Sequence, residues 1–291
     1  LCAFAYNALI PNFRVGHRSL RVSRHINMLE QLNGATRVHF IVGDPIAQVK
    51  SPAGVTQAYA DRGHNAVVVP AHVSPPNLAA WHAGVSLTQN VDGIIVTVPH
   101  KFACFDLCAT ASERATFLHT VNTMRRNADG TWHGDMFDGL GFVEAMRDKG
   151  CELAGKRALL IGAGGAGSAI AHALVLSGVD TLAIHDESDD RRTTLVDRLA
   201  GLNKSRVIHG SNDPTGFDIV LNATPMGMKE GDPFPADPAK LTANMFVGCV
   251  ITAPAISPLV AAARAIGCLT STGADMFGRV RDLMVEFLLS H

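Results

Sequence analysis

Residues 161–167 read Ile-Gly-Ala-Gly-Gly-Ala-Gly, and this stretch decides the fold of the second half of the chain. It follows an apolar run, residues 158–161, and opens an apolar-periodic stretch, which predicts a strand, a tight turn and a helix in that order. Gly162 permits the tight turn, Gly164 lets the backbone approach a phosphate, and Gly167 lets the helix pack on the strand. The unpaired N–H groups at the start of that helix would face a dinucleotide pyrophosphate.

The context of the glycines decides between this interpretation and simple close packing, for which glycines also serve. A second predicted strand, residues 181–185, ends at Asp186, nineteen residues after Gly167. An acidic side chain at that place accepts hydrogen bonds from ribose hydroxyls. We therefore expect a dinucleotide to contact this turn, through Gly162, Ala163, Gly164, Gly165, Ala166, Gly167 and Asp186.

The composition excludes several classes of protein. The 291 residues suit two domains, and 25 Lys and Arg against 26 Asp and Glu leave no basic surplus for nucleic acid. No apolar run of about 18 residues occurs, so we expect a soluble protein with no membrane partner. The six cysteines form no C-x-x-C pair, and the histidines lack metal-ligand spacing. We expect free thiols in a reducing cytoplasm and no metal site.

The first 27 residues stand apart from the rest of the chain. They contain four arginines and no acidic residue precedes Glu30, which is typical of a targeting presequence. A simpler alternative is that residues 1–27 extend a coding frame that begins at Met28, ten residues before the first predicted strand. We favour the second interpretation.

From Val38 onward, short β-rich runs alternate with helical stretches, which predicts an α/β fold with largely parallel sheets. We expect an N-terminal α/β substrate domain, residues 28–137 plus 272–291, and a Rossmann-type dinucleotide-binding domain, residues 138–271. The predicted strands are 38–42, 66–69, 93–96, 157–161, 181–185, 218–221 and 246–251, with a hairpin of 122–126 and 131–134. The predicted helices include 52–61, 78–83, 139–149 and 275–289.

Residues 96–101, Val-Thr-Val-Pro-His-Lys, lead from a strand through a proline into the start of a helix and so fix Lys101. The helix dipole and loss of water both disfavour an ammonium group there, which suits a general acid or base. The alternative is a solvated surface lysine. Two further segments, residues 121–123 and 134–139, favour the first interpretation because, together with residues 96–101, they occur in the order and at the spacing of a known family.

Taken together, these segments resemble the shikimate dehydrogenase family over about residues 38–289. The resemblance implies an active site between the two domains, a small-molecule hydroxy-carboxylate as substrate, a role in chorismate and aromatic amino acid biosynthesis, and a monomer or homodimer. The matching motifs are GDPIAQVKSP (43–52), VTVPHK (96–101), VNT (121–123), GDMFDG (134–139), GAGGAG (162–167) and NATPMGM (222–228).

The resemblance also implies roles for single residues. Lys101 and Asp138 match a dyad that binds the substrate's ring hydroxyls, with the lysine relaying a proton while hydride passes to the nicotinamide. Asn122 matches a contact to the same hydroxyls, and Ser51 matches the second serine of a carboxylate-binding pair. Ser51 is alternatively a helix N-cap before Pro52. The remaining positions that the motifs assign are Thr97 for the substrate, and Ala223, Thr224, Pro225 and Met226 for the cofactor.

Several departures from the family pattern fall where the family holds its substrate, and they make the expected pocket less polar. We expect these positions to line one cleft, so either shikimate is a poor substrate or the true substrate is less hydroxylated. They are Val49 for the first serine, Ile95 for an asparagine, Met136 and Phe137 for Asn-Thr of N-T-D, Thr252 for a tyrosine, and Val280 for a glutamine of the final helix.

The cofactor prediction depends on residues 186–188, Asp-Glu-Ser, where NADP-using members carry N-R-T or N-R-S. The carboxylates of Asp186 and Glu187 would repel a 2′-phosphate. Asp186 would instead accept hydrogen bonds from the free ribose hydroxyls of NAD. Arg191 and Arg192 on the following helix could compensate, although two neighbouring aspartates weaken that alternative. We expect NAD, with NADP disfavoured.

The sequence therefore predicts an NAD-dependent, reversible oxidation of a cyclic hydroxy-carboxylate of the shikimate or quinate type. Two alternatives remain open. One is the same chemistry on a less polar hydroxy acid, and the other is a non-catalytic NAD-binding sensor. Turnover with a hydroxy acid would distinguish the sensor from the two enzymes.

Overall fold

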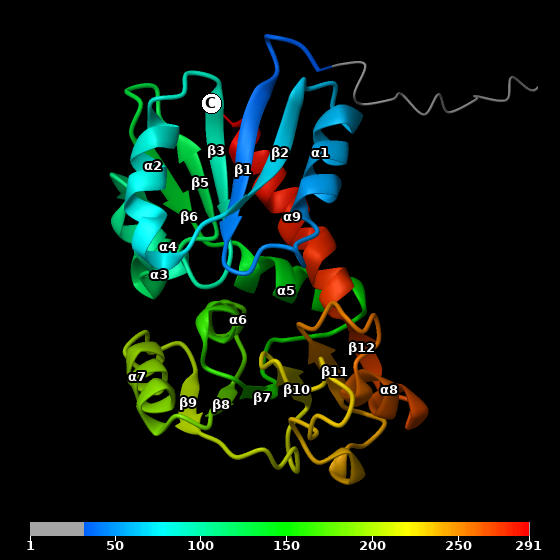
Figure 1. Ribbon diagram of the computed structural model, residues 1–291. Coiled ribbons are helices and arrows are strands. Elements are labelled where there is room, and N and C mark those ends of the chain that lie inside the picture. Colours follow the sequence, from blue (N-terminus) through cyan, green and yellow to red (C-terminus); the bar gives the residue numbers. More distant parts are fainter. Residues whose placement is uncertain (1–31, 291) are drawn as a thin grey trace, which may run out of the picture. The chain divides into compact units, whose positions relative to one another are not determined.

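The computed structural model describes residues 32–290, and residues 33–290 belong to one compact unit that contains two six-stranded sheets (Figure 1). The interpretation of residues 1–27 as an extension before Met28 lies outside the described residues. Within residues 32–290, no helix is long and apolar enough to cross a membrane. The same residues contain no group of three or more His, Cys, Asp or Glu side chains arranged to hold a metal ion.

The first sheet is mixed and has the strand order β2-β1-β3-β5-β6-β4. β1 is parallel to β2 and β3, whereas the hairpin of β5 and β6 is antiparallel, as predicted. β2 extends through Pro70, which its edge position tolerates because an edge strand has N–H groups that need no partner. The strands are β1 (Arg37–Gly43), β2 (Ala66–His72), β3 (Val91–Val96), β4 (Thr110–Ala111), β5 (Thr123–Arg126) and β6 (Trp132–Asp135), and the accompanying helices are α1 (Ser51–Asp61), α2 (Leu78–Ser86), α3 (Lys101–Asp106), α4 (Glu113–Leu118) and α9 (Gly273–Leu289).

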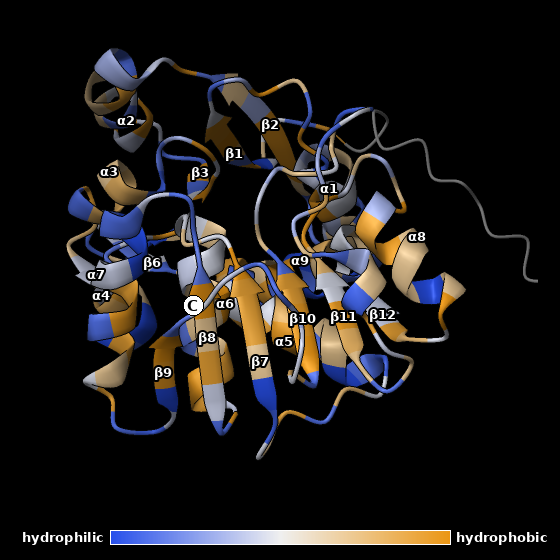
Figure 2. Ribbon diagram, turned by 90° about the horizontal axis from the view of Figure 1, so that it is seen from below, coloured by the Kyte–Doolittle hydropathy of each residue, from blue (hydrophilic) through white to orange (hydrophobic). Residues whose placement is uncertain are grey.

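The second sheet is entirely parallel, with the order β12-β11-β10-β7-β8-β9. Its strands are apolar along most of their length, as strands covered on both faces must be (Figure 2). Strand order reverses between β7 and β10, where an open α/β sheet binds its ligand. The elements are β7 (Arg157–Ile161), β8 (Thr181–His185), β9 (Arg206–His209), β10 (Ile219–Asn222), β11 (Phe246–Cys249) and β12 (Leu269–Ser271), with α5 (Asp138–Asp148), α6 (Gly165–Leu176), α7 (Asp189–Ala200) and α8 (Pro258–Ala265).

The predicted α/β class with a Rossmann-type sheet is confirmed, and the domain limits at residues 137 and 271 stay a prediction. The last helix differs slightly from its predicted range, because Thr272 and Asp275 form a capping box and α9 begins at Gly273. Its apolar face is covered as expected: Val280, Met284 and Leu288 are buried against residues of the first sheet and α1.

Two glycines place α5 between its neighbours. A Cβ atom at Gly139 would lie 2.0 Å from the carbonyl oxygen of Ala169 in α6, and one at Gly141 would lie 2.5 Å from Cγ2 of Val280 in α9. Only glycine allows these approaches. The first residue of α5, Asp138, is therefore held between α6 of the second sheet and α9, which packs on the first.

His39 on β1 is an unusual core residue. Its side chain is buried against Tyr59, with ring centroids 5.0 Å apart, and neither ring nitrogen has a hydrogen-bond partner among the described residues. Burial lowers the pKa of His39 to about 4, and the nearby charges of Asp92 and Arg37 act in opposite directions. Protonation below pH 6.5 therefore favours the unfolded chain.

We expect His39→Leu to reduce the acid sensitivity of folding. The stability linked to His39 is fully present above about pH 6.5 and is lost as the pH falls toward 4, by about 2 kcal/mol between pH 7 and pH 5. Urea unfolding at the two pH values measures this difference, and His64→Leu, at an exposed position, is the control. An equal acid-induced loss in the wild type and in His39→Leu would contradict the assignment.

Candidate active site

The centre of the candidate site is an ion pair between two helix starts. Lys101 is the first residue of α3 and Asp138 is the first residue of α5, and Nζ lies 2.5 Å from Oδ2. Their side chains are only 15% and 10% exposed. The buried Asn122 amide donates a hydrogen bond of 2.7 Å to the other oxygen of Asp138. The structure thus brings together three residues that the sequence analysis selected separately.

A small cavity of about 190 Å³ adjoins this pair. Its polar wall comes from Lys101, Asp138 and Asn122, with Ser51 and Thr97 nearby, and its other walls are mostly apolar. Among the residues that replace polar groups of the family, four line it: Val49, Ile95, Thr252 and Val280. The sequence analysis missed Ile41, Gln48, Lys50, Val96, Phe277 and Met284.

Of these missed residues, Gln48 and Lys50 had a usable signal because they flank Val49 within the motif of residues 43–52. Lys50 Nζ also donates to the carbonyl oxygen of Thr252, at 3.3 Å. The others come from strands β1 and β3 and from α9. Their positions depend on how those elements pack, which the sequence alone does not show.

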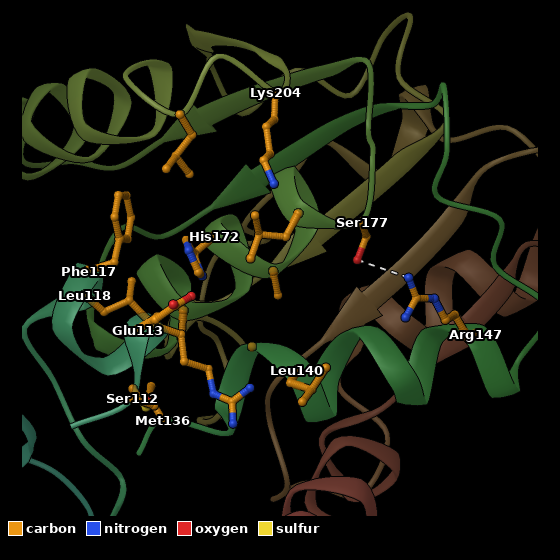
Figure 3. Close-up of a pocket in the computed structure, with 16 residues that line it drawn as sticks. Ser112, Glu113, Phe117, Leu118, Met136, Leu140, Arg147, His172, Ser177 and Lys204 are labelled. Atoms are coloured by element: carbon orange, nitrogen blue, oxygen red, sulfur yellow. Dashed lines mark hydrogen bonds between the residues drawn. The ribbon is translucent and has the colours of Figure 1, made fainter. Parts of the chain in front are cut away.

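Two predicted members of the cleft lie elsewhere. Met136 lines a different cavity (Figure 3), and Phe137 lines neither. Phe137 is 4% exposed and packs between the guanidinium of Arg114, 4.9 Å from the ring centroid, and the ring of Phe287. The prediction that Phe137 contacts substrate is wrong, because the turn after β6 directs its side chain into the core under α9.

The alternative role of Ser51 is also wrong. The N-cap of α1 is Lys50, and no side-chain capping bond is made there. Ser51 is instead the first helical residue, buried, and on the wall of the cavity.

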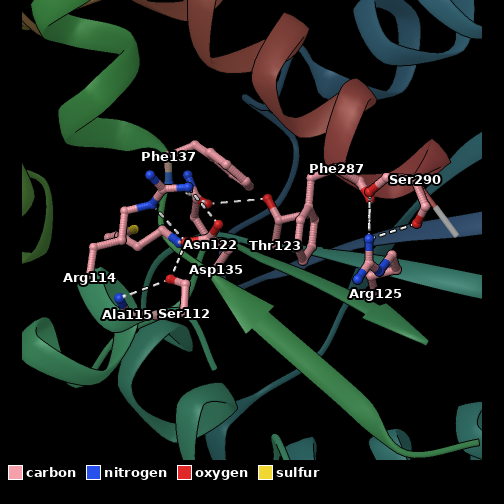
Figure 4. Close-up of polar contacts among 11 residues, drawn as sticks. Ser112, Arg114, Ala115, Asn122, Thr123, Arg125, Asp135, Phe137, Phe287 and Ser290 are labelled. Atoms are coloured by element: carbon pink, nitrogen blue, oxygen red, sulfur yellow. Dashed lines mark hydrogen bonds and ion pairs between the residues drawn. The ribbon is translucent and has the colours of Figure 1, made fainter. Parts of the chain in front are cut away.

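A second layer of polar contacts fixes the chain that leads to Asp138 (Figure 4). The buried Asp135 carboxylate accepts two hydrogen bonds from Arg114, at 2.7 and 2.6 Å, one from the Ser112 hydroxyl, and one from the N–H of Met136. The N–H of Phe137 donates to the Asn122 side chain, at 3.0 Å. This network sets the direction in which the backbone enters α5.

A second site lies at the glycine turn, where a cavity of about 510 Å³ is lined by Gly162, Gly164, Asp186 and all four predicted residues of 223–226. Gly162 has φ +107°, and a Cβ at Gly167 would lie 2.0 Å from the Gly162 carbonyl oxygen. A Cβ at Gly164 would meet nothing within 4 Å, so space is open at the start of α6. This geometry fits a dinucleotide pyrophosphate.

The remaining turn residues, Ala163, Gly165, Ala166 and Gly167, do not line that cavity. Gly165 nevertheless connects the two sites, because a Cβ placed there would lie 3.9 Å from Cδ of Lys101. The lysine thus lies beside the start of α6. A dinucleotide on the turn and a substrate at Lys101 would be neighbours.

Asp186 is engaged within the protein. One oxygen accepts the N–H of Ala163 at 2.7 Å, and the other accepts the N–H of Ser188 and the Arg191 guanidinium, at 2.8 and 2.7 Å. Burial opposes ionisation of Asp186, yet these donors together hold its pKa below the usual range. Arg191 lines the cavity, together with Asn212 and Phe234, which the sequence analysis missed.

Comparison with known proteins agrees with these features. The substrate-binding domain of shikimate dehydrogenase matches residues 41–124. A shikimate dehydrogenase (NADP+) of Rubrobacter xylanophilus is 35% identical over 252 residues, which cover 84% of this chain and 88% of that protein. A solved shikimate dehydrogenase in complex with NADP+ has a TM-score of 0.83 at 27% identity, covering 89% of this chain and 91% of that one. A 5-ketofructose reductase of Gluconobacter has a TM-score of 0.80 at 27% identity, covering 88% and 94%.

The expectation that NAD is the cofactor is wrong. Relatives that align with 84% of the chain, at 31–35% identity, are named for NADP+. The sequence argument treated Asp186 as a free carboxylate that would repel a 2′-phosphate. In the structure its charge is paired with Arg191, and the guanidinium lies on the cavity wall.

These relatives align with most of the chain, and the paired lysine and aspartate lie beside a turn shaped for a dinucleotide. The chain belongs to the shikimate dehydrogenase family, oxidoreductases that act on a CH–OH group with a nicotinamide dinucleotide as acceptor.

Proposed function

We propose that this protein uses NADP to interconvert the CH–OH group of a small hydroxy-carboxylate and the corresponding carbonyl. The observation that carries the proposal is the buried Lys101–Asp138 pair, which faces the substrate cavity and lies beside the glycine turn. Residues 162–167 and 223–226 would hold the cofactor, which accepts a hydride when bound. A panel of hydroxy acids, including shikimate and quinate, screened for NADPH formation tests the proposal and would separate an enzyme from a dinucleotide-binding sensor.

The protein's own part in the reaction is the transfer of the proton. Lys101 Nζ, as the neutral amine, takes the proton of the reacting hydroxyl as the C–H bond breaks, and the resulting ammonium returns a proton in the opposite direction. Asp138 holds Nζ in place and offers an acceptor to a hydroxyl, while Asn122 fixes the carboxylate of Asp138.

The substrate class follows from the cavity walls. The Ser51 hydroxyl and the Lys50 ammonium are donors suited to a carboxylate, and both residues line the cavity. Val49, Ile95 and Val280 offer no partner to further hydroxyls, and each buried hydroxyl without one costs about 1–3 kcal/mol. A hydroxy-carboxylate with fewer ring hydroxyls than shikimate therefore fits best, with shikimate or quinate themselves as the second candidate.

We expect Lys101→Met to lower kcat by about a hundredfold or more, since the proton loses its acceptor. Binding of NADP+, measured by calorimetry, should change little. Lys50→Met is the matched comparison: it should raise KM for a carboxylate substrate and leave kcat within a few-fold. Near-wild-type turnover in Lys101→Met would show that this lysine does not carry the proton.

The pocket makes a separate prediction. The double variant Val49→Ser, Val280→Gln should raise kcat/KM for shikimate more than the two single variants together, because neighbouring contacts to one ligand couple. Phe137→Thr is the control: it should reduce stability without this gain, since Phe137 lies outside the cavity. If Phe137→Thr alone raises kcat/KM for shikimate, the cavity assignment is wrong.

The cofactor site is tested by two adjacent arginines. Arg191→Ala should weaken NADP+ binding about tenfold or more and NAD+ binding much less, because a guanidinium beside the 2′-phosphate is lost. Arg192→Ala removes a similar charge from a side chain that pairs with Asp189 and His209 instead. Equal losses of NADP+ and NAD+ affinity in Arg191→Ala would rule out this contact.

A further inference from the structure

The cavity that Met136 lines is larger than the two sites described above, about 720 Å³, and shares no lining residue with either. It lies among α4, α5 and α6, and Arg147 lines it near the end of α5 (Figure 3). Phe117, Leu118, Met136 and Leu140 give it apolar walls. Its volume is in the range of sites for small organic ligands. The proposed reaction makes no use of it.

The charged side chains of this cavity are mostly positive. Arg114, Arg147 and Lys204 line it, against the single acid Glu113. Arg114 is paired with Asp135, but Arg147 and Lys204 have no ion-pair partner within residues 32–290. An anion inside the cavity would therefore meet two positive charges that the protein leaves uncompensated.

An aromatic platform lies beside these charges. The rings of Phe117 and His172 are stacked, with centroids 4.6 Å apart and planes at 25°. Burial, and then the positive charges of Arg114, Lys204 and Arg198, lower the pKa of His172, so its imidazole is neutral at pH 7. Its ring nitrogens have no hydrogen-bond partner among the described residues. A neutral imidazole provides one N–H donor for an anion.

We propose that this cavity is an effector site for a small organic anion with an aromatic body. The apolar walls and the Phe117–His172 stack bind the ring, and Lys204 and the His172 N–H bind the anionic group. An aliphatic phosphate or a free inorganic anion would leave the apolar walls uncovered. A neutral aromatic would leave the charges uncompensated.

Arg114 connects this cavity to the reaction centre. The same guanidinium that lines the cavity holds Asp135, and Asp135 fixes the backbone that enters α5 at Asp138. The carbonyl oxygen of Asp135 also accepts the N–H of Asn122, at 2.9 Å. The charge of Arg114 also acts on the imidazole of His172, so an anion held at His172 competes for Arg114, loosens the support of Asp138 and changes kcat.

The test is calorimetry with 2-naphthoate as the probe and 2-naphthalenemethanol as its neutral counterpart, on the whole chain saturated with NADP+. We expect 2-naphthoate to bind in a 1:1 ratio and the alcohol to bind much more weakly. Lys204→Met should reduce the affinity for 2-naphthoate about fivefold or more, and Glu113→Gln should increase that affinity. Arg206→Met removes an exposed charge two residues from Lys204, outside the cavity, and should change nothing.

Three results would overturn the proposal. One is the absence of saturable 2-naphthoate binding at millimolar concentration. A second is affinity that falls in Lys50→Met and not in Lys204→Met, which would place the probe in the substrate cavity. A third is bound 2-naphthoate that leaves kcat at saturating substrate unchanged, which would remove the effector role. The binding measurements need no turnover, so their failure is distinct from a failure of the proposed function.

Discussion

The ion pair between Lys101 and Asp138 is the contact on which the rest of the site depends. A buried ion pair is tolerated only where the remaining polar atoms also find partners. Here Asn122 satisfies the second oxygen of Asp138, and the backbone that delivers Asp138 is fixed by Asp135. Lys101 begins α3, the helix after β3, and Asp138 begins α5, so the pair joins a helix beside the first sheet to the helix that precedes the second. This arrangement explains why α5 needs glycines: it must approach both α6 and α9 closely to place one carboxylate.

The cavity at the glycine turn and the substrate cavity offer different groups, and each is suited to a different ligand. The glycine turn offers open space and N–H groups, at the reversal of strand order where parallel sheets bind ligands. The substrate cavity offers a few donors at one end and apolar walls elsewhere. Lys101 lies beside the first residue of α6, so both ligands would meet at its amine.

Much of this arrangement could be predicted from the sequence, because it depends on local patterns. The glycine turn, the hairpin of β5 and β6, the helix start at Lys101 and the apolar face of α9 each follow from spacing and residue type. What failed depends on side-chain direction and on pairing across elements. Phe137 points into the core although it follows Met136 in a substrate motif, and Arg191 reaches back from α7 to neutralise Asp186. Neither turn direction nor the partner of a carboxylate can be read from spacing alone.

The most direct measurement of the central claim is a crystal structure of Asp138→Asn with NADP+ and the best hydroxy-carboxylate substrate. The account predicts that the oxygen of the reacting hydroxyl lies about 3 Å from Nζ of Lys101. It also predicts that the substrate carboxylate lies against Ser51 and Lys50. A substrate whose reacting hydroxyl lies well beyond hydrogen-bond distance of Lys101, or one that binds in another cavity, would contradict the assignment of this ion pair as the reaction centre.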